Sequence, residues 1–195
     1  MKLDAETRCG FYVSEQRKKV WQAELDMAKA ALGICDKYGF KIFAIGGTLI
    51  GAVRHGGFIP WDDDIDLFMP RTDYEKFIVA AKTELSEPYF LQHYTTEKKY
   101  PNGHVQIRNS ETTCFIKDSY NDLKSGKNCG VFIDIFPYDN IPDGKTERTK
   151  FWKKIKRLKN FVMWKIYPTE KNLKGFTQKC VATAYFCFQL GKSST

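Results

Sequence analysis

The spacing of apolar residues predicts a long helix near the start of the chain. Between residues 14 and 37, apolar side chains recur every three or four positions, which gathers them on one face of a helix. Ser14 is suited to cap the first turn, and Gly39 to end the helix in a left-handed conformation. Residues 48–55, TLIGAVRH, predict a second and shorter helix that two glycines close.

Two more helices are predicted further along the chain. Residues 72–85 carry an apolar face, with Thr72 as the expected N-cap and Glu75 as its partner in a capping box. Residues 145–166 combine basic and apolar positions at helical spacing, so we expect an amphipathic basic helix there.

Short apolar runs between these helices predict strands. The expected strands are 41–47, 65–69 and 130–139, with weaker runs at 89–94, 104–108 and 112–117. The sequence contains neither G-x-G-x-x-G nor G-x-x-x-x-G-K-[ST], so a Rossmann domain and a P-loop are not supported. The order of helices and strands predicts an α+β fold in which helices pack on a mixed sheet.

Charge divides the chain into two regions. The 195 residues carry a net charge of +8, yet residues 145–165 hold nine Lys/Arg and one Glu, and residues 166–195 hold four Lys and one Glu. The first 144 residues are therefore net acidic. We expect a catalytic core over 1–144 and a basic helical region over 145–195.

The composition of the sequence also limits where in the cell we expect the protein to be. No window approaches the roughly 18 apolar residues of a membrane span, and the first residues lack the apolar run of a signal peptide. None of the six cysteines forms a Cys-x-x-Cys pair, which gives a zinc site little support and favours reduced thiols. We expect a cytoplasmic protein with at most peripheral contact with the inner membrane face.

A dense run of carboxylates precedes and enters the predicted strand 65–69. Asp62, Asp63, Asp64 and Asp66 fall within five positions. Because side chains alternate along a strand, Asp64 and Asp66 are expected on one face, with the apolar neighbours of Asp66 in the core. Paired carboxylates suit Mg²⁺, which takes one or two of them together with substrate phosphates.

A further carboxylate, Asp134, interrupts the apolar strand 130–139. A charge between two isoleucines is costly to bury without a partner. If this strand lies beside 65–69, the resulting three-carboxylate site could hold one or two metal ions. An acidic run is more often a solvated loop, but carboxylates inside two apolar strands favour a metal site.

Residues around the aspartate run are candidates for binding a phosphorylated substrate. Glycines allow close approach to the backbone, and the N–H groups at a helix start attract phosphate. Cations can neutralise a diphosphate, and a tryptophan can stack on a base or enclose an alkylammonium group. The candidates are Gly46, Gly47, Thr48, Arg54, His55, Trp61 and Arg108. Each also has an ordinary structural interpretation as a turn, a helix-end charge or a packing residue.

Three stretches together resemble the LicD family, which includes the fukutin-related proteins. They are GGTLIGAVRHGGFIPWDDDIDLFMPR, IRNSETT and GVFIDIFPYD, and they extend over the middle half of the chain. The resemblance implies a nucleotidyltransferase-like fold, with Gly46-Gly47 as the glycine turn and Asp64, Asp66 and Asp134 as catalytic metal ligands. It also implies that Asp62 helps to bind a second metal ion.

The resemblance implies Mg²⁺-dependent transfer of a phospho-alcohol group, most often phosphocholine. The donor would be a CDP-alcohol, the acceptor a hydroxyl of a cell-surface glycan such as a teichoic acid or lipopolysaccharide precursor, and the leaving group CMP. One or two Mg²⁺ ions, or Mn²⁺ in their place, would neutralise the diphosphate. The chain is expected to lack a Tyr-Gly-Asp-Tyr-type segment that family members carry near their end.

Two other functions fit part of the pattern. The same carboxylates serve nucleotidyltransferases, which move a nucleoside monophosphate from a nucleoside triphosphate and release pyrophosphate. A non-catalytic module could instead bind nucleic acid or another polyanion through 145–166, but it would leave the aspartates without a purpose. The same helix is also suited to contact an anionic membrane or polymer, which is compatible with transferase activity.

Overall fold

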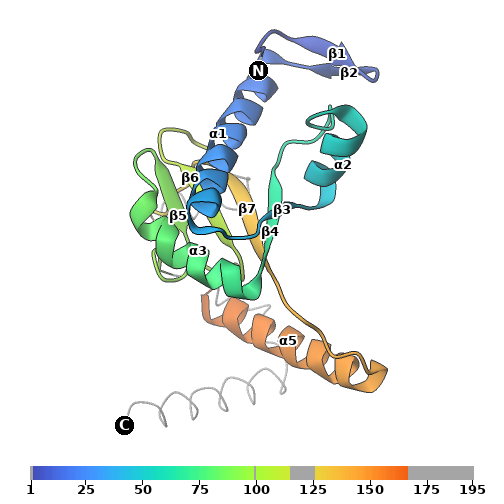
Figure 1. Ribbon diagram of the computed structural model, residues 1–195, viewed down its shortest axis with the longest axis vertical. Helices are drawn as coiled ribbons and strands as arrows, with labels where there is room; N and C mark the ends of the chain where they lie inside the picture. The colour runs from blue at the N-terminus through green and yellow to red at the C-terminus, as the bar shows by residue number, and fades with distance from the viewer. Residues whose placement is uncertain (1, 99, 115–125, 167–195) are drawn as a thin grey trace. The chain divides into compact units, whose positions relative to one another are not determined.

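The computed structural model describes residues 2–98, 100–114 and 126–166 (Figure 1). The chain forms two compact units. The first contains Met1–Lys98 and Asn102–Asp139, and the second contains Lys99–Pro101 and Asn140–Thr195. The strands that the structure describes lie in the first unit, and helix α5 (Lys145–Ile166) lies in the second. The bounds of α5 are those expected from its apolar and basic spacing.

A five-stranded mixed sheet forms the centre of the first unit. Its strand order is β3-β4-β7-β6-β5, in which β4 and β7 are parallel and every other neighbouring pair is antiparallel. This arrangement confirms the predicted α+β class. The strands are β3 (Phe43–Ala44), β4 (Asp66–Pro70), β5 (Tyr89–Gln92), β6 (Val105–Asn109) and β7 (Val131–Tyr138).

Helices α1 (Glu15–Tyr38) and α3 (Arg71–Glu84) cover one face of this sheet (Figure 1). Alternate strand residues point toward these helices and are buried, while the intervening residues face the other way. The core formed in this way includes Met27, Ala31, Leu67, Met69, Phe77, Ile107, Ile133 and Ile135. The hydrophobic effect therefore fixes which face of β4 and β7 remains available for polar side chains.

The ends of the helices test the capping predictions. Ser14 accepts a hydrogen bond from the backbone of Arg17, and Gly39 is left-handed with φ 69°, so both predicted ends of α1 are confirmed. The capping box at Thr72 is wrong. Helix α3 begins at Arg71, and no side chain caps it, because its N-cap residue is Pro70, which has no side-chain oxygen; Glu75 pairs instead with Arg71 at 3.0 Å.

Two further predictions are corrected. Helix α2 (Gly46–His55) begins two residues earlier than expected, and the strand before it is only Phe43–Ala44, so the two glycines form the first turn of the helix. Residues 112–114 form no strand, and the rest of the weak run 112–117 lies outside the described residues. Among the helices that the structure describes, none is long and apolar enough to cross a membrane.

A short hairpin of β1 (Glu6–Arg8) and β2 (Phe11–Val13) precedes α1 and was not predicted. Cys9 and Gly10 both have positive φ, 51° and 75°, as a tight two-residue hairpin turn requires. Arg8 donates hydrogen bonds to the carbonyl oxygens of His55 and Phe58 at 3.2 and 3.4 Å. The hairpin is thereby attached to the end of α2 and to the loop that leads toward the aspartates.

Candidate functional site

The structure places Asp66 and Asp134 side by side on the parallel strands β4 and β7, where they are partners in register. Neighbouring strands lie about 5 Å apart, so two carboxylates on the same face are within range of one metal ion. Both point away from the face that α1 and α3 cover, since Leu67 and Ile135, the next residues along each strand, are buried in the core. The expected pairing of the two apolar strands is therefore present.

This pair belongs to a row of polar side chains that crosses four strands. Gln106 on β6 is in register with Asp134, and Gln92 on β5 is in register with Gln106. Gln106 donates a hydrogen bond to Asp134 Oδ1 at 2.8 Å, and His104 Nε2 lies 3.0 Å from the same oxygen. Asp134 is thus oriented from one side by two neighbours, and Asp66 lies on its other side.

Arg108, two residues after Gln106 on β6, binds the two glutamines of this row. Its guanidinium donates to Gln106 Oε1 at 2.7 Å, to Gln92 Oε1 at 2.5 Å and to the carbonyl oxygen of Gly130 at 2.6 Å. It also lies over the ring of Phe132, 4.5 Å from the centroid. These contacts orient the two glutamines, and the phosphate contact expected of Arg108 from the sequence stays a prediction.

Backbone hydrogen bonds fix Asp66 against the start of α2. The N–H of Asp66 donates to Thr48 Oγ1 at 2.8 Å, and its carbonyl oxygen accepts from the N–H of Ile45 at 3.1 Å. On the other side, the N–H of Asp134 donates to the carbonyl oxygen of Ile65 at 3.0 Å. Thr48, a predicted substrate-binding residue, therefore holds the start of the strand that carries Asp66.

The two glycines at the start of α2 lie directly against aspartate side chains. Gly46 has a φ of +58°, and a Cβ there would lie 3.6 Å from Asp66 Oδ2. A Cβ on Gly47 would lie 2.2 Å from Asp62 Oδ2, so any side chain would displace that carboxylate. Ile45 provides no side-chain cap, so N–H groups of the first turn remain for another partner.

Burial and mutual repulsion both raise pKa values in the aspartate run. The pKa of Asp64 is raised to about 6, first by desolvation and then by the negative charges of Asp66 and Asp62, with smaller effects of Asp63 and Asp134. The pKa of Asp66 is also raised, by burial and then by Asp134, although His104 opposes the shift. The carboxylates of this run therefore lose solvent contact and also repel one another, and both effects disfavour their charged forms.

Arg54, His55 and Trp61 form a second group beside the hairpin. Arg54 and His55 end α2, about 12 Å along the helix axis from Gly46, and Arg54 Nε donates to His55 Nε2 at 3.2 Å. The ring of Trp61 meets that of His55 edge-on, with centroids 6.1 Å apart, and the side chain is 52% exposed. Because Trp61 directly precedes Asp62, it connects this group with the aspartates.

Helix α1 contributes residues that the sequence analysis did not select. Arg17 Nη1 and Trp21 Nε1 each donate to the carbonyl oxygen of Asp62 at 2.9 Å, and the ring of Trp21 stacks on Phe58 at 4.7 Å. These contacts hold the aspartate loop from the α1 side. Trp21 was assigned to the apolar face of the helix, and nothing in its local sequence reveals a partner 41 positions away. His104 and Gln106 were missed for the same reason.

The donor atoms fit a hard divalent cation. Asp62, Asp64, Asp66 and Asp134 offer oxygen ligands, which Mg²⁺ and Mn²⁺ prefer, and the raised pKa values of Asp64 and Asp66 indicate missing positive charge. Among the described residues, no three His, Cys, Asp or Glu side chains converge closely enough to hold an ion by themselves. Mg²⁺ suits such an open arrangement, because it usually keeps several waters and binds substrate phosphates as well.

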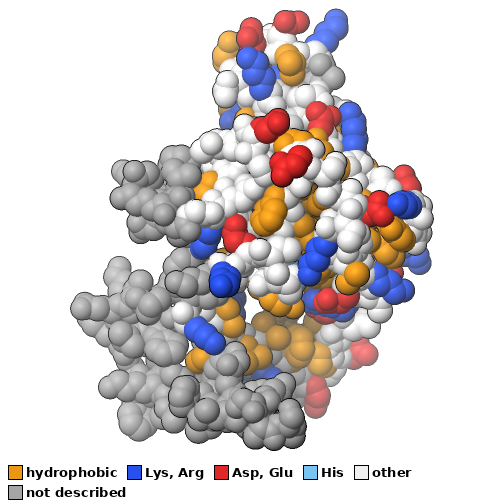
Figure 2. Space-filling model, turned by 90° about the vertical axis from the view of Figure 1, so that its left-hand side faces the viewer, with side chains coloured by type: hydrophobic (Ala, Val, Ile, Leu, Met, Phe, Trp, Pro, Cys, Tyr) orange, Lys and Arg blue, Asp and Glu red, His pale blue; other side chains and the backbone are white. Residues whose placement is uncertain are grey.

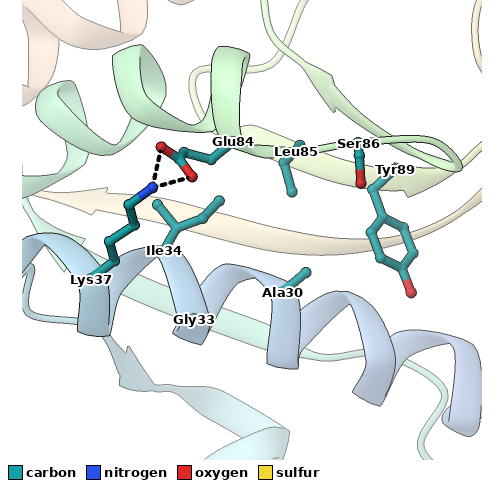
Figure 3. Close-up of a pocket in the computed structure, with 8 residues that line it drawn as sticks. All are labelled: Ala30, Gly33, Ile34, Lys37, Glu84, Leu85, Ser86 and Tyr89. Atoms are coloured by element: carbon teal, nitrogen blue, oxygen red, sulfur yellow. Dashed lines mark hydrogen bonds and ion pairs between the residues drawn. The ribbon is translucent and has the colours of Figure 1, made fainter.

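A separate pocket of about 230 Å³ lies between the C-terminal half of α1 and the segment that leads from the end of α3 to the start of β5 (Figure 3). Its lining is Ala30, Gly33, Ile34, Lys37, Glu84, Leu85, Ser86 and Tyr89. Lys37 and Glu84 form an ion pair at 2.7 Å at one end of it. On the face of the molecule that Figure 2 shows, acidic, basic and apolar side chains are mixed. None of the predicted site residues lines the pocket, so it is not the candidate site.

Comparisons with known proteins agree with the geometry. The family model described as "LicD/FKTN/FKRP, nucleotidyltransferase domain" matches residues 39–176. The lipopolysaccharide cholinephosphotransferase LicD of Haemophilus influenzae is 36% identical over 129 residues, which cover 65% of this chain and 45% of that protein. The human and mouse ribitol 5-phosphate transferases FKRP are each 43% identical over 42 residues, 22% of this chain and 8% of theirs. The chain therefore spans less than half the length of these relatives.

Proposed function

Since the chain belongs to the LicD family of nucleotidyltransferase-domain proteins, we propose that it transfers a phospho-alcohol group from a CDP-alcohol to a glycan hydroxyl and releases CMP. Phosphocholine is the proposed group, because the similar Haemophilus protein is a cholinephosphotransferase of lipopolysaccharide. The acceptor class is the hydroxyl of a cell-surface glycan, such as a lipopolysaccharide or teichoic acid precursor.

One observation supports this proposal above the others, namely the register pairing of Asp66 with Asp134 beside the Gly46-Gly47 turn. Such a pair would bind Mg²⁺, with Asp64 interacting with the ion through its water ligands, and the ion would supply positive charge to the donor's diphosphate and to the leaving CMP. A carboxylate pair of this kind has no evident structural purpose, since each carboxylate raises the cost of ionising its neighbour.

The protein's own groups would do the remaining work. The N–H groups at the start of α2 are positioned to bind phosphate oxygens. Asp134 would accept the proton of the attacking hydroxyl, with Gln106 and His104 holding its carboxylate in place. The exposed ring of Trp61 is suited to stack on the cytosine or to cover the choline ammonium group.

A thermal-shift panel tests the proposal. CDP-choline, CDP-ribitol, CDP-glycerol, CTP and ATP would each be added with Mg²⁺ or with EDTA. We expect the largest stabilisation from a CDP-alcohol in Mg²⁺, about 2.7 kcal/mol at 100 times its Kd, and release of CMP when an acceptor glycan is present. Equal stabilisation by ATP and by every CDP-alcohol, unchanged in EDTA, would contradict the proposal. Stronger binding of CTP together with pyrophosphate release would identify a nucleotidyltransferase instead.

We also propose that α5 carries the contact with an anionic membrane surface or polymer. Its exposed apolar side chains, which include Trp152, Ile155 and Leu158, alternate with the basic residues of the 145–165 segment. Basic and apolar groups on one helix favour adsorption to an anionic interface. Such a contact would keep the enzyme near a lipid-linked or polymeric acceptor.

A further inference from the structure

Glu24 is a buried carboxyl group with an unused hydrogen-bonding atom. It lies on α1 with 2% of its surface exposed, and its Oε2 has no hydrogen-bond partner among the described residues. A buried polar atom left without a partner typically costs about 1–3 kcal/mol. An apolar residue or a neutral amide would fill this position at lower cost if its only role were packing.

The position of Glu24 relates it to the aspartate loop. Arg17, Trp21 and Glu24 are spaced four and three residues apart, so they lie along one stripe of α1. The first two bind the carbonyl oxygen of Asp62. Glu24 continues the stripe, and the charges of Asp64, Asp63 and Asp62 add to burial in raising its pKa to about 9. The buried carboxyl group therefore lies within electrostatic range of the loop.

Electrostatic interactions connect the loop aspartates with Glu24 and with the strand pair. Asp66 and Asp134 both contribute to the raised pKa of Asp64, whereas the charges that raise the pKa of Glu24 are those of the three loop aspartates. A cation held at the loop would therefore interact with the strand pair and with Glu24.

We propose that Glu24 is the α1-side carboxylate of the divalent-cation site, and that its free Oε2 accepts a hydrogen bond from the hydration water of that cation. Contact through water fits the structure, because the described carboxylates do not converge closely enough for three of them to bind one ion directly. This inference rests on the proposed function only in that the aspartates bind a cation. Glu24 lies outside residues 39–176, which match the family model.

The test is a titration of the full chain with Mg²⁺ and with Mn²⁺. Calorimetry and the melting temperature measure the binding of each cation. Four proteins would be compared: wild type, Glu24→Gln, Asp66→Asn and Asp36→Asn. Asp36 is an exposed carboxylate near the end of the same helix, so its variant controls for the loss of one negative charge. Glu24→Gln should bind the cations about 10-fold more weakly, as removal of an outer contact typically does, while Asp36→Asn should match wild type.

Stability without metal separates a cation-directed role from a packing role. In EDTA, Glu24→Gln should melt at the same temperature as wild type or higher, since it loses a carboxyl group surrounded by like charges. Glu24→Asp keeps the charge but shortens the side chain, so it should also weaken cation binding. If Glu24→Gln fails to fold in EDTA while Glu24→Asp binds the cations as wild type does, the residue is structural and the inference is overturned.

The outcomes also distinguish this inference from the proposed function. If wild type binds neither Mg²⁺ nor Mn²⁺, both proposals fail. If wild type binds them, Asp66→Asn abolishes binding and Glu24→Gln binds as wild type does, then the aspartate site stands and the role of Glu24 does not. Weakened binding by Glu24→Gln with an unchanged Asp36→Asn variant supports both.

Discussion

The two ends of the β4–β7 strand pair differ in how their carboxylates are partnered. At one end, Asp66 and Asp134 face each other in register as two carboxylates. At the other end, just past both strands, Arg71 donates to the two carboxylate oxygens of Asp139, at 2.7 and 2.5 Å, and to Glu75 at 3.0 Å. The same two strands therefore carry one unbalanced pair and one balanced pair.

The pKa shifts of the two ends follow this difference. Hydrogen bonding to Arg71 lowers the pKa of Asp139, while burial and the neighbouring Asp134 raise the pKa of Asp66. A fold that places an arginine beside one carboxylate could do so beside another. Within the described residues, Asp66 has no such arginine partner, which agrees with the proposal that a bound cation would supply positive charge there.

The largest expected effect comes from neutralising the unbalanced end. Asp66→Asn and Asp134→Asn should each lower transferase activity by about 10³-fold or more, because the carboxylate pair would hold the ion that neutralises the diphosphate. Neither change should destabilise the metal-free protein, and each could stabilise it by about 0.5–2 kcal/mol. CMP release and chemical denaturation in EDTA measure the two effects. Full activity per folded molecule together with a large loss of stability would make the pair structural.

The pH dependence of stability should differ between Glu24, whose pKa is raised, and Asp139, whose pKa is lowered. Glu24 has a raised pKa, from 4.5 to about 9, so the folded state holds a proton that the unfolded state has released, and stability falls as pH rises through this range. One such group contributes a slope of at most about 1.4 kcal/mol per pH unit. In EDTA, Glu24→Gln should remove that slope between pH 5 and about pH 9, as measured by urea denaturation. An unchanged slope would show that Glu24 ionises normally.

At the balanced end, the contribution of Asp139 to stability should change with pH in the opposite direction to that of Glu24, and by a smaller amount. The lowered pKa of Asp139 means that its contribution is present at neutral pH and is lost as the solution is acidified below the ordinary aspartate range. Both partners are partly exposed, so Asp139→Asn should lower the free energy of unfolding by only about 0.5–1 kcal/mol. Cation and CDP-alcohol affinities should stay at wild-type values. A loss of donor affinity in this variant would mean that the two ends are not independent.

The smallest expected effect concerns the positive charge of α5. Replacing Lys153, Lys154, Lys156 and Arg157 with Gln should leave cation and donor affinities unchanged, because the unbalanced end is expected to draw its positive charge from a ligand. The same variant should bind anionic vesicles or polymer more weakly and with a smaller dependence on salt. Co-sedimentation and calorimetry distinguish these outcomes. A large loss of CDP-alcohol binding would assign the helix to the donor site.

The parts of the site that the sequence could predict are those with a local signal. A carboxylate inside an apolar strand is conspicuous, which is why Asp66 and Asp134 could be selected and their strands expected to pair. The α5 boundaries followed from periodicity alone. The partners of Arg108 could not be predicted, because its contacts with Gln92 and Gly130 depend on which strands lie beside β6, and strand order is not written in any local pattern.

The predicted starts of two helices, α2 and α3, were wrong for a different reason. Thr72 and Glu75 have the composition of a capping box, but the cap depends on where the preceding strand ends, and β4 extends to Pro70. Similarly, α2 begins at Gly46, since Asp66 binds Thr48 and Ile45 and draws the chain into the helix earlier than its propensity indicates. In both cases a contact with the sheet outweighs the local preference.

The parallel pairing of β4 with β7 has a consequence for folding kinetics. It joins segments separated by α3, β5, β6 and the loops between them, so we expect it to form late compared with the antiparallel contacts of neighbouring segments. Asp66 and Asp134 are consequently far apart until the folding transition state has been passed. A cation that needs both carboxylates stabilises the native state without stabilising that transition state. Mg²⁺ should therefore slow unfolding and leave the refolding rate almost unchanged.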